Sequence, residues 1–486
     1  MINDFSYYLK AGFPYFYIET YEADRCIEDL KKETKKYNSD AQIFVWDIMT
    51  TDLPPDPMEI LNKIKESKTR SIFILKNYNW FMTSNNSPNP FIVQFFQNNY
   101  EPFCSGNFRK SIVVVSDSSF DSIPSSIKKH FIDLKFDLPD EKEISIILDN
   151  LIEIASKNPK FDSKKCTKEL KERVVDAALG MTAQAVENSL ALCVIQHGEL
   201  IPKVIDRIKA QDIEGIAGVK YTEYDSSFSE LKGLDNLKFF VTKTINHPNS
   251  KGIILLGPCG NGKTYFAQCL SNETGMRMLT VEMAEFQGGI VGETEQKVRQ
   301  AIRAIRAMAG TKGVICLVDE LEKSLSGIGG NQTVSSDSIT ARAMGQWLKF
   351  MQDPGCKVYF IATCNDISKI PPEYLRAERW DTAPFFVDLP NIVERETILT
   401  HYMKAYNVKG KIKADNLEGW SGAEIKALCR IADMMKSTTD EVIDFIVPMS
   451  KTAKKQIQDL RTWAVGNTIP ATRKITIGKT ERELSL

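Results

Sequence analysis

The chain has 486 residues, of which 43% are hydrophobic and 26% are charged, a composition typical of a globular protein. This length is too great for one ordinary core and predicts two or three domains. The 62 lysines and arginines almost balance the 63 aspartates and glutamates, so the net charge of -1 excludes an overall electrostatic drive toward DNA or an anionic membrane.

The cysteines and histidines indicate no metal site. Ten cysteines contain no CxxC pair, and the four histidines lie far apart, so zinc-site spacing is absent. Buried, reduced thiols suit a reducing compartment. The start of the chain lacks the basic residues and long apolar run of a signal peptide, and no apolar stretch approaches the roughly 20 residues that span a bilayer. We therefore expect a cytoplasmic protein.

The first part of the chain, residues 1–210, alternates strand and helix signals, which predicts βαβ units and a parallel three-layer sheet. The expected strands are residues 14–20, 41–48, 71–77 and 111–118, and the expected helices are residues 23–37 and 56–67. A linker is expected at residues 211–227, which are rich in small and polar residues.

The stretch IILLGPCGNGKT predicts a short strand, a glycine-rich turn and a helix that begins near Thr264. Gly257, Gly260 and Gly262 let the backbone turn tightly and aim its N–H groups at phosphate oxygens, to which the helix N-terminus adds its positive dipole end. Lys263 can reach the β- and γ-phosphates, and the Thr264 hydroxyl can ligate Mg²⁺. The nucleotide-binding residues expected along this loop are Pro258, Cys259, Gly260, Asn261, Gly262, Lys263, Thr264 and Tyr265.

Acidic and amide side chains follow two later strands. Residues 314–318 are apolar and predict a buried parallel strand, after which Asp319 and Glu320 emerge. Parallel sheets gather ligands at this edge, beside the phosphate loop. We expect Asp319 to hold the Mg²⁺ hydration shell and Glu320 to polarise the attacking water. The next strand, residues 357–365, ends in Asn365, whose amide can orient that water or touch the γ-phosphate.

Two arginines, Arg376 and Arg379, follow in the stretch PPEYLRAERWD. An arginine aimed at the transferring phosphate stabilises transition-state charge, and its supply by a neighbouring subunit couples hydrolysis to assembly. Surface salt bridges are the alternative role, and the residues alone leave the two roles open.

The order GPCGNGKT, LVDE, ATCN, LRAERWD and GWSGAEIKALCR resembles the AAA+ ATPases, close to the AAA family proper, over about residues 225 to 445. The resemblance implies that Lys263 and Thr264 form Walker A, that Asp319 and Glu320 form Walker B, and that Asn365 is sensor 1. It puts Arg376 and Arg379 on the arginine-finger positions. It also implies that Gly233 and Leu234 flank adenine and that Gly422 and Ala423 belong to the helical lid.

A narrower resemblance, carried by DELEKSLSGIGG, GQWLKFMQD and GFPYFYIETYEADR, is to the AAA+ family described as hypothetical chloroplast reading frame forty-six. It implies an N-terminal region ahead of one AAA+ module. The expected fold is therefore α/β: a P-loop module with a large ATPase subdomain at residues 228–390, a helical lid at 391–465 and a polar tail at 466–486.

The first 210 residues resemble a degenerate copy of that module. FDLPDEKEISIIL parallels VDLPNIVERETIL, and GMTAQAVENSLALC parallels GWSGAEIKALCRIA, which indicates an internal repeat. The copy has IETYEADR in place of a phosphate loop, and Lys76 and Asn77 in place of the paired acids. A generic α/β domain is the alternative, and under either interpretation the region is not a second ATPase.

The residues predict ATP hydrolysis but leave its purpose open. The expected pore loop, residues 285–299, has Ile290 at the aromatic position, after Gly288 and Gly289, which weakens the case for a firm grip on a threaded polymer. Three hypotheses stay open: an ATP-driven and Mg²⁺-dependent machine that remodels a protein client, a nucleotide-switched scaffold, and a nucleic-acid motor. A homo-oligomeric ring, expected to be a hexamer, is common to the first two.

Overall fold

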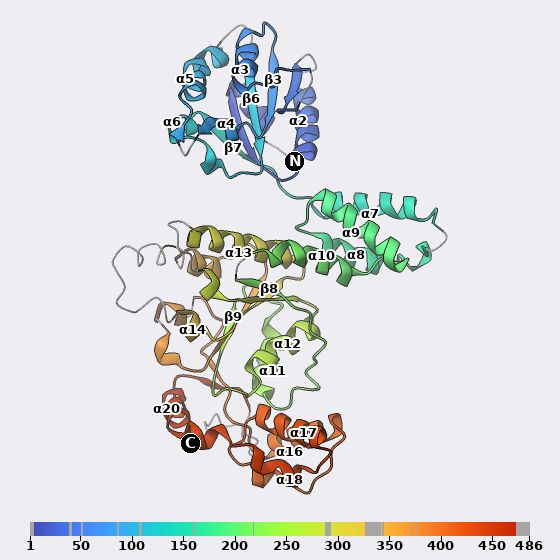
Figure 1. Cartoon of the computed structure of the whole chain (residues 1–486), viewed down its shortest axis with the longest axis vertical. Coiled ribbons are helices and arrows are strands. Elements are labelled where there is room, and N and C mark those ends of the chain that lie inside the picture. Colours follow the sequence, from blue (N-terminus) through green and yellow to red (C-terminus); the bar gives the residue numbers. More distant parts are fainter. Residues whose placement is uncertain are drawn as a thin grey trace. The chain divides into compact units, whose positions relative to one another are not determined.

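The computed structural model describes residues 4–472 except for 38–40, 50–51, 85–86, 106–108, 159–160, 217, 287–292, 326–341, 343–344, 371 and 377. The chain separates into two compact units (Figure 1). Unit one comprises residues 1–154 and 181–191, and unit two comprises residues 155–180 and 192–486. Within the described ranges, no helix is both long and apolar enough to cross a membrane.

Unit one is built on a five-stranded, entirely parallel sheet with the order β2-β3-β6-β1-β7. Its strands are β1 (Tyr15–Glu19), β2 (Gln42–Trp46), β3 (Ser71–Lys76), β6 (Lys110–Ser116) and β7 (Phe131–Lys135), and a short hairpin joins β4 (Thr83–Ser84) to β5 (Ser87–Pro88). Because side chains alternate across a strand, Tyr15 and Tyr17 face one core while Phe16 and Ile18 face the other. The sheet is therefore covered on both faces.

Helices alternate with the strands of unit one along the chain and follow its last strand. They are α1 (Phe5–Ala11), α2 (Ala23–Tyr37), α3 (Pro57–Glu66), α4 (Asn79–Met82), α5 (Pro90–Ser105), α6 (Ser125–Lys128), α7 (Glu141–Ala155) and the first part of α9 (Ala183–His197). Buried residues of α1 and α2 pack on one face of the sheet, and those of α3 and α5 pack on the other.

Unit two contains the sheet β14-β13-β9-β12-β11-β10-β8. The strands are β8 (Val219–Tyr221), β9 (Gly252–Leu256), β10 (Arg277–Val281), β11 (Val314–Val318), β12 (Val358–Cys364), β13 (Phe385–Phe386) and β14 (Ile469–Pro470). All neighbours are parallel except β8, which runs antiparallel to β10. The two edge strands of this sheet were not predicted: β8 lies in the expected linker, and β14 lies in the expected tail.

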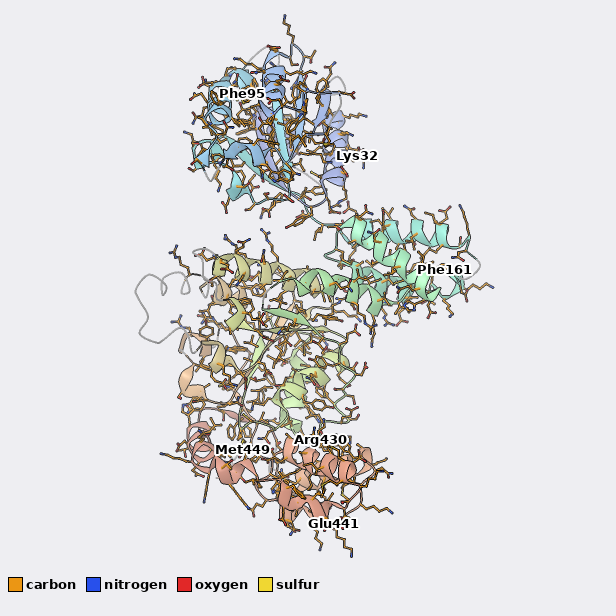
Figure 2. All side chains as sticks on the ribbon, in the orientation of Figure 1. Lys32, Phe95, Phe161, Arg430, Glu441 and Met449 are labelled. Carbon is orange, nitrogen blue, oxygen red and sulfur yellow. The ribbon has the colours of Figure 1, made fainter. Side chains whose placement is uncertain are left out.

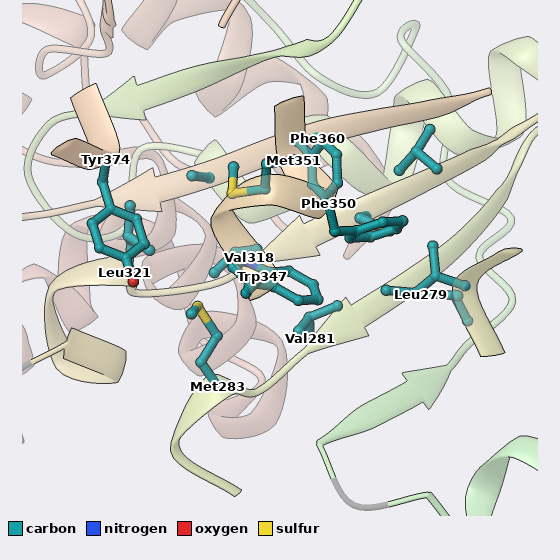
Figure 3. Close-up of a cluster of buried hydrophobic side chains, with 14 of the residues drawn as sticks. Leu279, Val281, Met283, Val318, Leu321, Trp347, Phe350, Met351, Phe360 and Tyr374 are labelled. Atoms are coloured by element: carbon teal, nitrogen blue, oxygen red, sulfur yellow. The ribbon is translucent and has the colours of Figure 1, made fainter. Parts of the chain in front are cut away.

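The helices of unit two form two layers and a separate lid. They are α8 (Lys168–Ala178), α10 (Pro202–Glu214), α11 (Asp235–Thr244), α12 (Lys263–Thr274), α13 (Glu293–Ala309), α14 (Leu321–Leu325), α16 (Ile392–Ala405), α17 (Gly422–Met435), α18 (Thr439–Val442), α19 (Met449–Thr452) and α20 (Lys454–Ala464). Helices α11 and α12 pack on one sheet face. Helix α13 packs on the other with residues 345–352, around the buried Trp347, Phe350 and Phe360 (Figure 3).

The lid has a small core of its own, made by α16, α17 and α18 around Leu399, Trp420 and Leu428. Arg430, Glu441 and Met449 mark three of its helices in Figure 2. Capping boxes begin α16 at Asn391 and α17 at Ser421, where each side chain accepts the N–H of a glutamate three residues on. These caps fix where the lid helices start.

The two sheets share one topology. When the five parallel strands β1, β2, β3, β6 and β7 of unit one, and β9 to β13 of unit two, are counted in chain order, both sheets read fifth, first, fourth, third, second. The register agrees too, because Glu19 pairs with Ser116 and Lys135 as Leu256 pairs with Cys364 and Phe386. This correspondence supports the predicted internal repeat.

A buried ion cluster joins the helical segment before β8 to the sheet of unit two. The Arg277 guanidinium, at the start of β10, contacts Asp206 of α10 at 2.6 Å and Asp176 of α8 at 3.1 Å. Asp176 also accepts the backbone N–H of Thr311 at 2.7 Å. Arg277 and Asp176 are buried, and burial raises the pKa of Asp206. Arg277 therefore holds α8 and α10 against the sheet of unit two.

Arg277→Met is expected to destabilise unit two by about 3–5 kcal/mol, because it removes the guanidinium that contacts both buried carboxylates. Arg299→Met, on the exposed side of α13, is the control and is expected to change stability by less than about 0.5 kcal/mol. Urea denaturation of the full chain measures both. Equal midpoints for the two variants would contradict a structural role for the cluster.

Candidate active site

The predicted phosphate loop connects β9 to α12 through residues 257–262. Gly260 and Gly262 have φ values of 77° and 84°, in the left-handed region that favours glycine. A side chain at Gly260 would also meet the lid, because an added Cβ would lie 3.0 Å from the Ser421 hydroxyl. Backbone strain and close lid contact therefore explain why glycine occupies this turn.

The loop opens onto a cavity of about 550 Å³. Most of the predicted binding residues line it: Leu234, Cys259, Gly260, Asn261, Gly262, Lys263, Thr264, Tyr265, Asp319, Glu320, Asn365, Gly422 and Ala423. Gly233 and Pro258 lie beside the lining. The Ala423 N–H donates to the Gly260 carbonyl at 2.9 Å, so the lid touches the phosphate loop directly.

The Lys263 ammonium is buried at the floor of this cavity. It donates to the carbonyls of Gly257 at 2.7 Å and Pro258 at 2.8 Å, and to Asn365 Oδ1 at 2.9 Å. Burial lowers the pKa of Lys263. A cation held by neutral oxygens in a polar pocket is suited to an anionic ligand.

Thr264 and Asp319 converge as a pair of oxygen donors. The Thr264 hydroxyl donates to Asp319 Oδ1 at 3.0 Å, although the two residues lie on different elements. Thr363, near the end of β12, donates its hydroxyl to the same carboxylate and accepts the Glu320 N–H at 2.9 Å. Hydroxyl and carboxylate oxygens are the ligands that Mg²⁺ prefers, so this pair fits that ion. Thr363 was not among the site residues predicted from the sequence.

Glu320 follows β11 in a left-handed conformation with φ of 49°. Its carboxylate lies at the cavity and forms an exposed ion pair with Lys323 at 2.7 Å. Exposed pairs of this kind are weak, so the carboxylate is available to a ligand in the cavity.

The lid and the segment before α11 close the other end of the cavity. Side chains that the sequence analysis did not identify line this end: Glu230, Lys232, Ile398, His401, Tyr402 and Lys426. The Tyr265 hydroxyl donates to Glu230 at 2.6 Å, and burial, with this bond, raises the pKa of Tyr265. Burial lowers the pKa of His401. The only sequence signal that could have placed His401 at the cavity is its position along the predicted lid helix, α16.

The two predicted arginine fingers differ in exposure. Arg376 is exposed, whereas Arg379 is 6% exposed and is buried by residues of its own chain. Neither residue lines the cavity, and no arginine does among the residues described. The predicted pore residues Gly288, Gly289 and Ile290 lie outside the described residues.

Unit one carries different side chains at the positions of the site. Lys76 is the last residue of β3 and corresponds to Asp319, directly after β11, while Asp24 is the second residue of α2 as Thr264 is of α12. Lys76 donates to Asp24 at 2.9 Å, so an ammonium–carboxylate pair replaces the hydroxyl–carboxylate pair. The backbone is nevertheless retained, because Asn77, like Glu320, is left-handed, with φ of 53°.

A carboxylate also lies at the strand-to-helix turn of unit one. Only residues 20–22 connect β1 to α2. The Glu22 carboxylate is buried and accepts the N–H of Ala183, at the start of α9, at 2.5 Å. Arg25 contacts Glu22 at 2.8 Å and Glu143 at 3.2 Å. The turn of unit one that corresponds to the phosphate loop therefore ends in a buried carboxylate, which accepts the first N–H of α9.

Three regions of the chain match models of known families. Residues 253–386 match the ATPase family associated with various cellular activities (AAA). Residues 1–136 match the N-terminal domain of SpoVK-like AAA ATPases, and residues 142–211 match their second domain. The chain therefore contains an AAA ATPase domain preceded by SpoVK-like AAA ATPase domains, which confirms the predicted class and the predicted α/β fold.

Similar proteins support the narrower resemblance. An uncharacterized AAA domain-containing protein ycf46 from Guillardia theta is 25% identical over 95% of this chain and 94% of its own length. Its counterpart from Trieres chinensis is 26% identical over 94% and 95%. The proteasome-activating nucleotidase of Archaeoglobus fulgidus is 33% identical, over 43% of this chain and 55% of its own length.

One nucleotide is expected to bind per full-length chain. Lys263→Ala should weaken ATP binding about 10- to 100-fold, because a charge-assisted contact contributes about 1.5–3 kcal/mol. Lys76→Ala, which removes a lysine at the end of β3 in unit one, should leave affinity unchanged. Isothermal titration calorimetry measures both, and a stoichiometry of two would contradict the account of unit one.

Proposed function

We propose that the chain is a Mg²⁺-dependent AAA+ ATPase that acts as a ring, most simply a hexamer, and uses hydrolysis to remodel a protein partner. The observation that carries this proposal is the convergence of Lys263, the Thr264–Asp319 pair, Glu320 and Asn365 on one cavity. These groups come from the ends of the adjacent strands β11 and β12 and from the start of α12.

In the proposed reaction, Lys263 leaves its carbonyl partners to contact the β- and γ-phosphates. Thr264 and Asp319 would hold Mg²⁺, which when bound offsets the phosphate charge. Glu320 accepts a proton from the attacking water, while the bond between the γ-phosphorus and its bridging oxygen breaks. Asn365 orients the water or the γ-phosphate with its amide.

An arginine from a neighbouring subunit completes the site in this proposal. The described lining of the cavity contains lysines but no arginine, and Arg376 is exposed away from it. Phosphoryl transfer is strongly accelerated by an arginine that faces the developing charge. Arg376 is therefore the better candidate for a finger in trans, and Arg379, which is buried, is a better candidate for support of the same segment.

Action on a protein partner is supported by the names of relatives and by the charge balance. The relative from Archaeoglobus fulgidus is a proteasome-activating nucleotidase, and the net charge of -1 offers no general attraction to nucleic acid.

The ten cysteines are free, which suits work in the reducing cytoplasm.

The test is assembly and turnover of the full chain as a function of protein concentration, with ATP and Mg²⁺ present. Mass photometry should show a ring, and specific ATPase activity should rise as the ring forms. Activity that is independent of concentration in a monomer would refute the ring. Rings that turn over ATP but whose Glu320→Gln form retains no protein partner would favour a nucleotide-switched scaffold.

A further inference from the structure

Glu322, in the first turn of α14, is a buried acid that the proposed reaction does not use. It is 4% exposed and does not line the cavity. Its Oε1 accepts two hydrogen bonds from one residue, from the backbone N–H of Asn365 at 3.1 Å and from Asn365 Nδ2 at 3.0 Å. Its Oε2 has no hydrogen-bond partner among the described residues. A buried carboxylate is costly, so this arrangement calls for an explanation.

The two partners of Asn365 determine which way its amide points. The Glu322 carboxylate can only accept, and the Lys263 ammonium can only donate. Asn365 therefore directs Nδ2 toward Glu322 and Oδ1 toward Lys263, at 3.0 Å and 2.9 Å. A rotated amide would face an acceptor with an acceptor and a donor with a donor. The second hydrogen of Nδ2 remains available for the cavity.

The degenerate copy offers an internal comparison. Asn79 follows β3 at the place where Glu322 follows β11, and it is 3% exposed. Both positions are buried and polar, but only the unit that has a phosphate loop carries a charged group there. Asn79 donates instead to the Ser122 hydroxyl at 3.2 Å. A neutral side chain, whose Oδ1 also has no hydrogen-bond partner among the described residues, thus occupies this position where no reaction is expected.

We propose that Glu322 is a positioning residue for ATP hydrolysis that acts through Asn365. It holds the Asn365 amide so that one N–H faces the γ-phosphate or the attacking water. The inference rests on the proposed ATPase function. It assigns Glu322 no contact with the nucleotide or with water. Its effect is therefore on the rate of turnover and not on nucleotide affinity.

The experiment is a double-mutant cycle in the full chain with Glu322→Ala, Asn365→Ala and the double variant. Glu322→Ala is expected to lower kcat about 10²-fold, as misplacement of a reacting group does, with KM and the Kd for a fluorescent ATP analogue changed less than about twofold. The double variant should be no slower than Asn365→Ala alone, because Glu322 acts only through that residue.

Two further variants separate positioning from folding. Glu322→Gln keeps the shape and an acceptor oxygen, so it should recover part of kcat. Asn79→Ala removes the matching buried polar group in unit one and should leave kcat unchanged. Wild-type kcat in Glu322→Ala, or additive losses in the cycle, would overturn the inference while the ATPase proposal stands. Loss of nucleotide affinity in Glu322→Gln would also overturn it. An inactive wild-type ring would instead refute the proposed function.

Discussion

Arg376→Ala is expected to lower the ATPase rate of the assembled chain about 10³- to 10⁵-fold, the range that an arginine finger contributes in other phosphoryl-transfer enzymes. Arg376 is exposed and absent from its own cavity, so its removal should leave folding and nucleotide affinity unchanged. A coupled assay of phosphate release at saturating ATP measures the loss.

Arg379→Ala is the matched comparison, since it removes the same side chain three residues further on. Arg379 is buried, so its loss should lower the melting temperature, and any loss of turnover should follow the loss of folded protein. A fully active Arg376→Ala ring alongside a stable, inactive Arg379→Ala ring would reverse the assignment.

Glu320→Gln is expected to lower turnover about 10²- to 10⁴-fold while ATP stays bound, because the amide cannot accept the proton of water. The replacement keeps the size of the side chain and removes only the exposed ion pair with Lys323, which contributes little to stability. Quenched-flow measurement of a single turnover, together with filter binding, distinguishes lost chemistry from lost binding.

Asn77→Asp is the control for that variant, since Asn77 has the same left-handed conformation at the end of β3. It introduces an acid at the position that Glu320 occupies in the other sheet, without a phosphate loop beside it. Turnover should stay at the wild-type rate. Restored hydrolysis in a Glu320→Gln, Asn77→Asp double variant would contradict the assignment of a single ATPase site.

The sequence was sufficient to predict features that depend on local pattern. The apolar run at residues 314–318 is a buried strand, as its composition indicates, and the glycines of the phosphate loop occupy left-handed positions. The convergence of Lys263 with Asp319 was also predictable, because parallel strands present their carboxyl ends at one edge. Fold class and protein class therefore follow from the sequence.

Features that depend on distant contacts could not be predicted. Residues 219–221 look like part of a linker until β10 supplies their hydrogen-bond partners. Glu322 resembles any acid on an exposed helix turn until β12 brings Asn365 against it. Arg376 and Arg379 are alike in sequence, and only their burial distinguishes them.

The central claim, that each active site takes a residue from its neighbour, is tested most directly by mixing two inactive proteins. Arg376→Ala rings keep Lys263 but lack the finger, and Lys263→Ala rings keep the finger but lack the lysine that contacts the phosphates. Subunit exchange should restore partial ATPase activity, highest near equal proportions, where an intact pocket meets an intact arginine. Mixed rings, verified by mass photometry, that remain as inactive as either parent at every ratio would contradict the account.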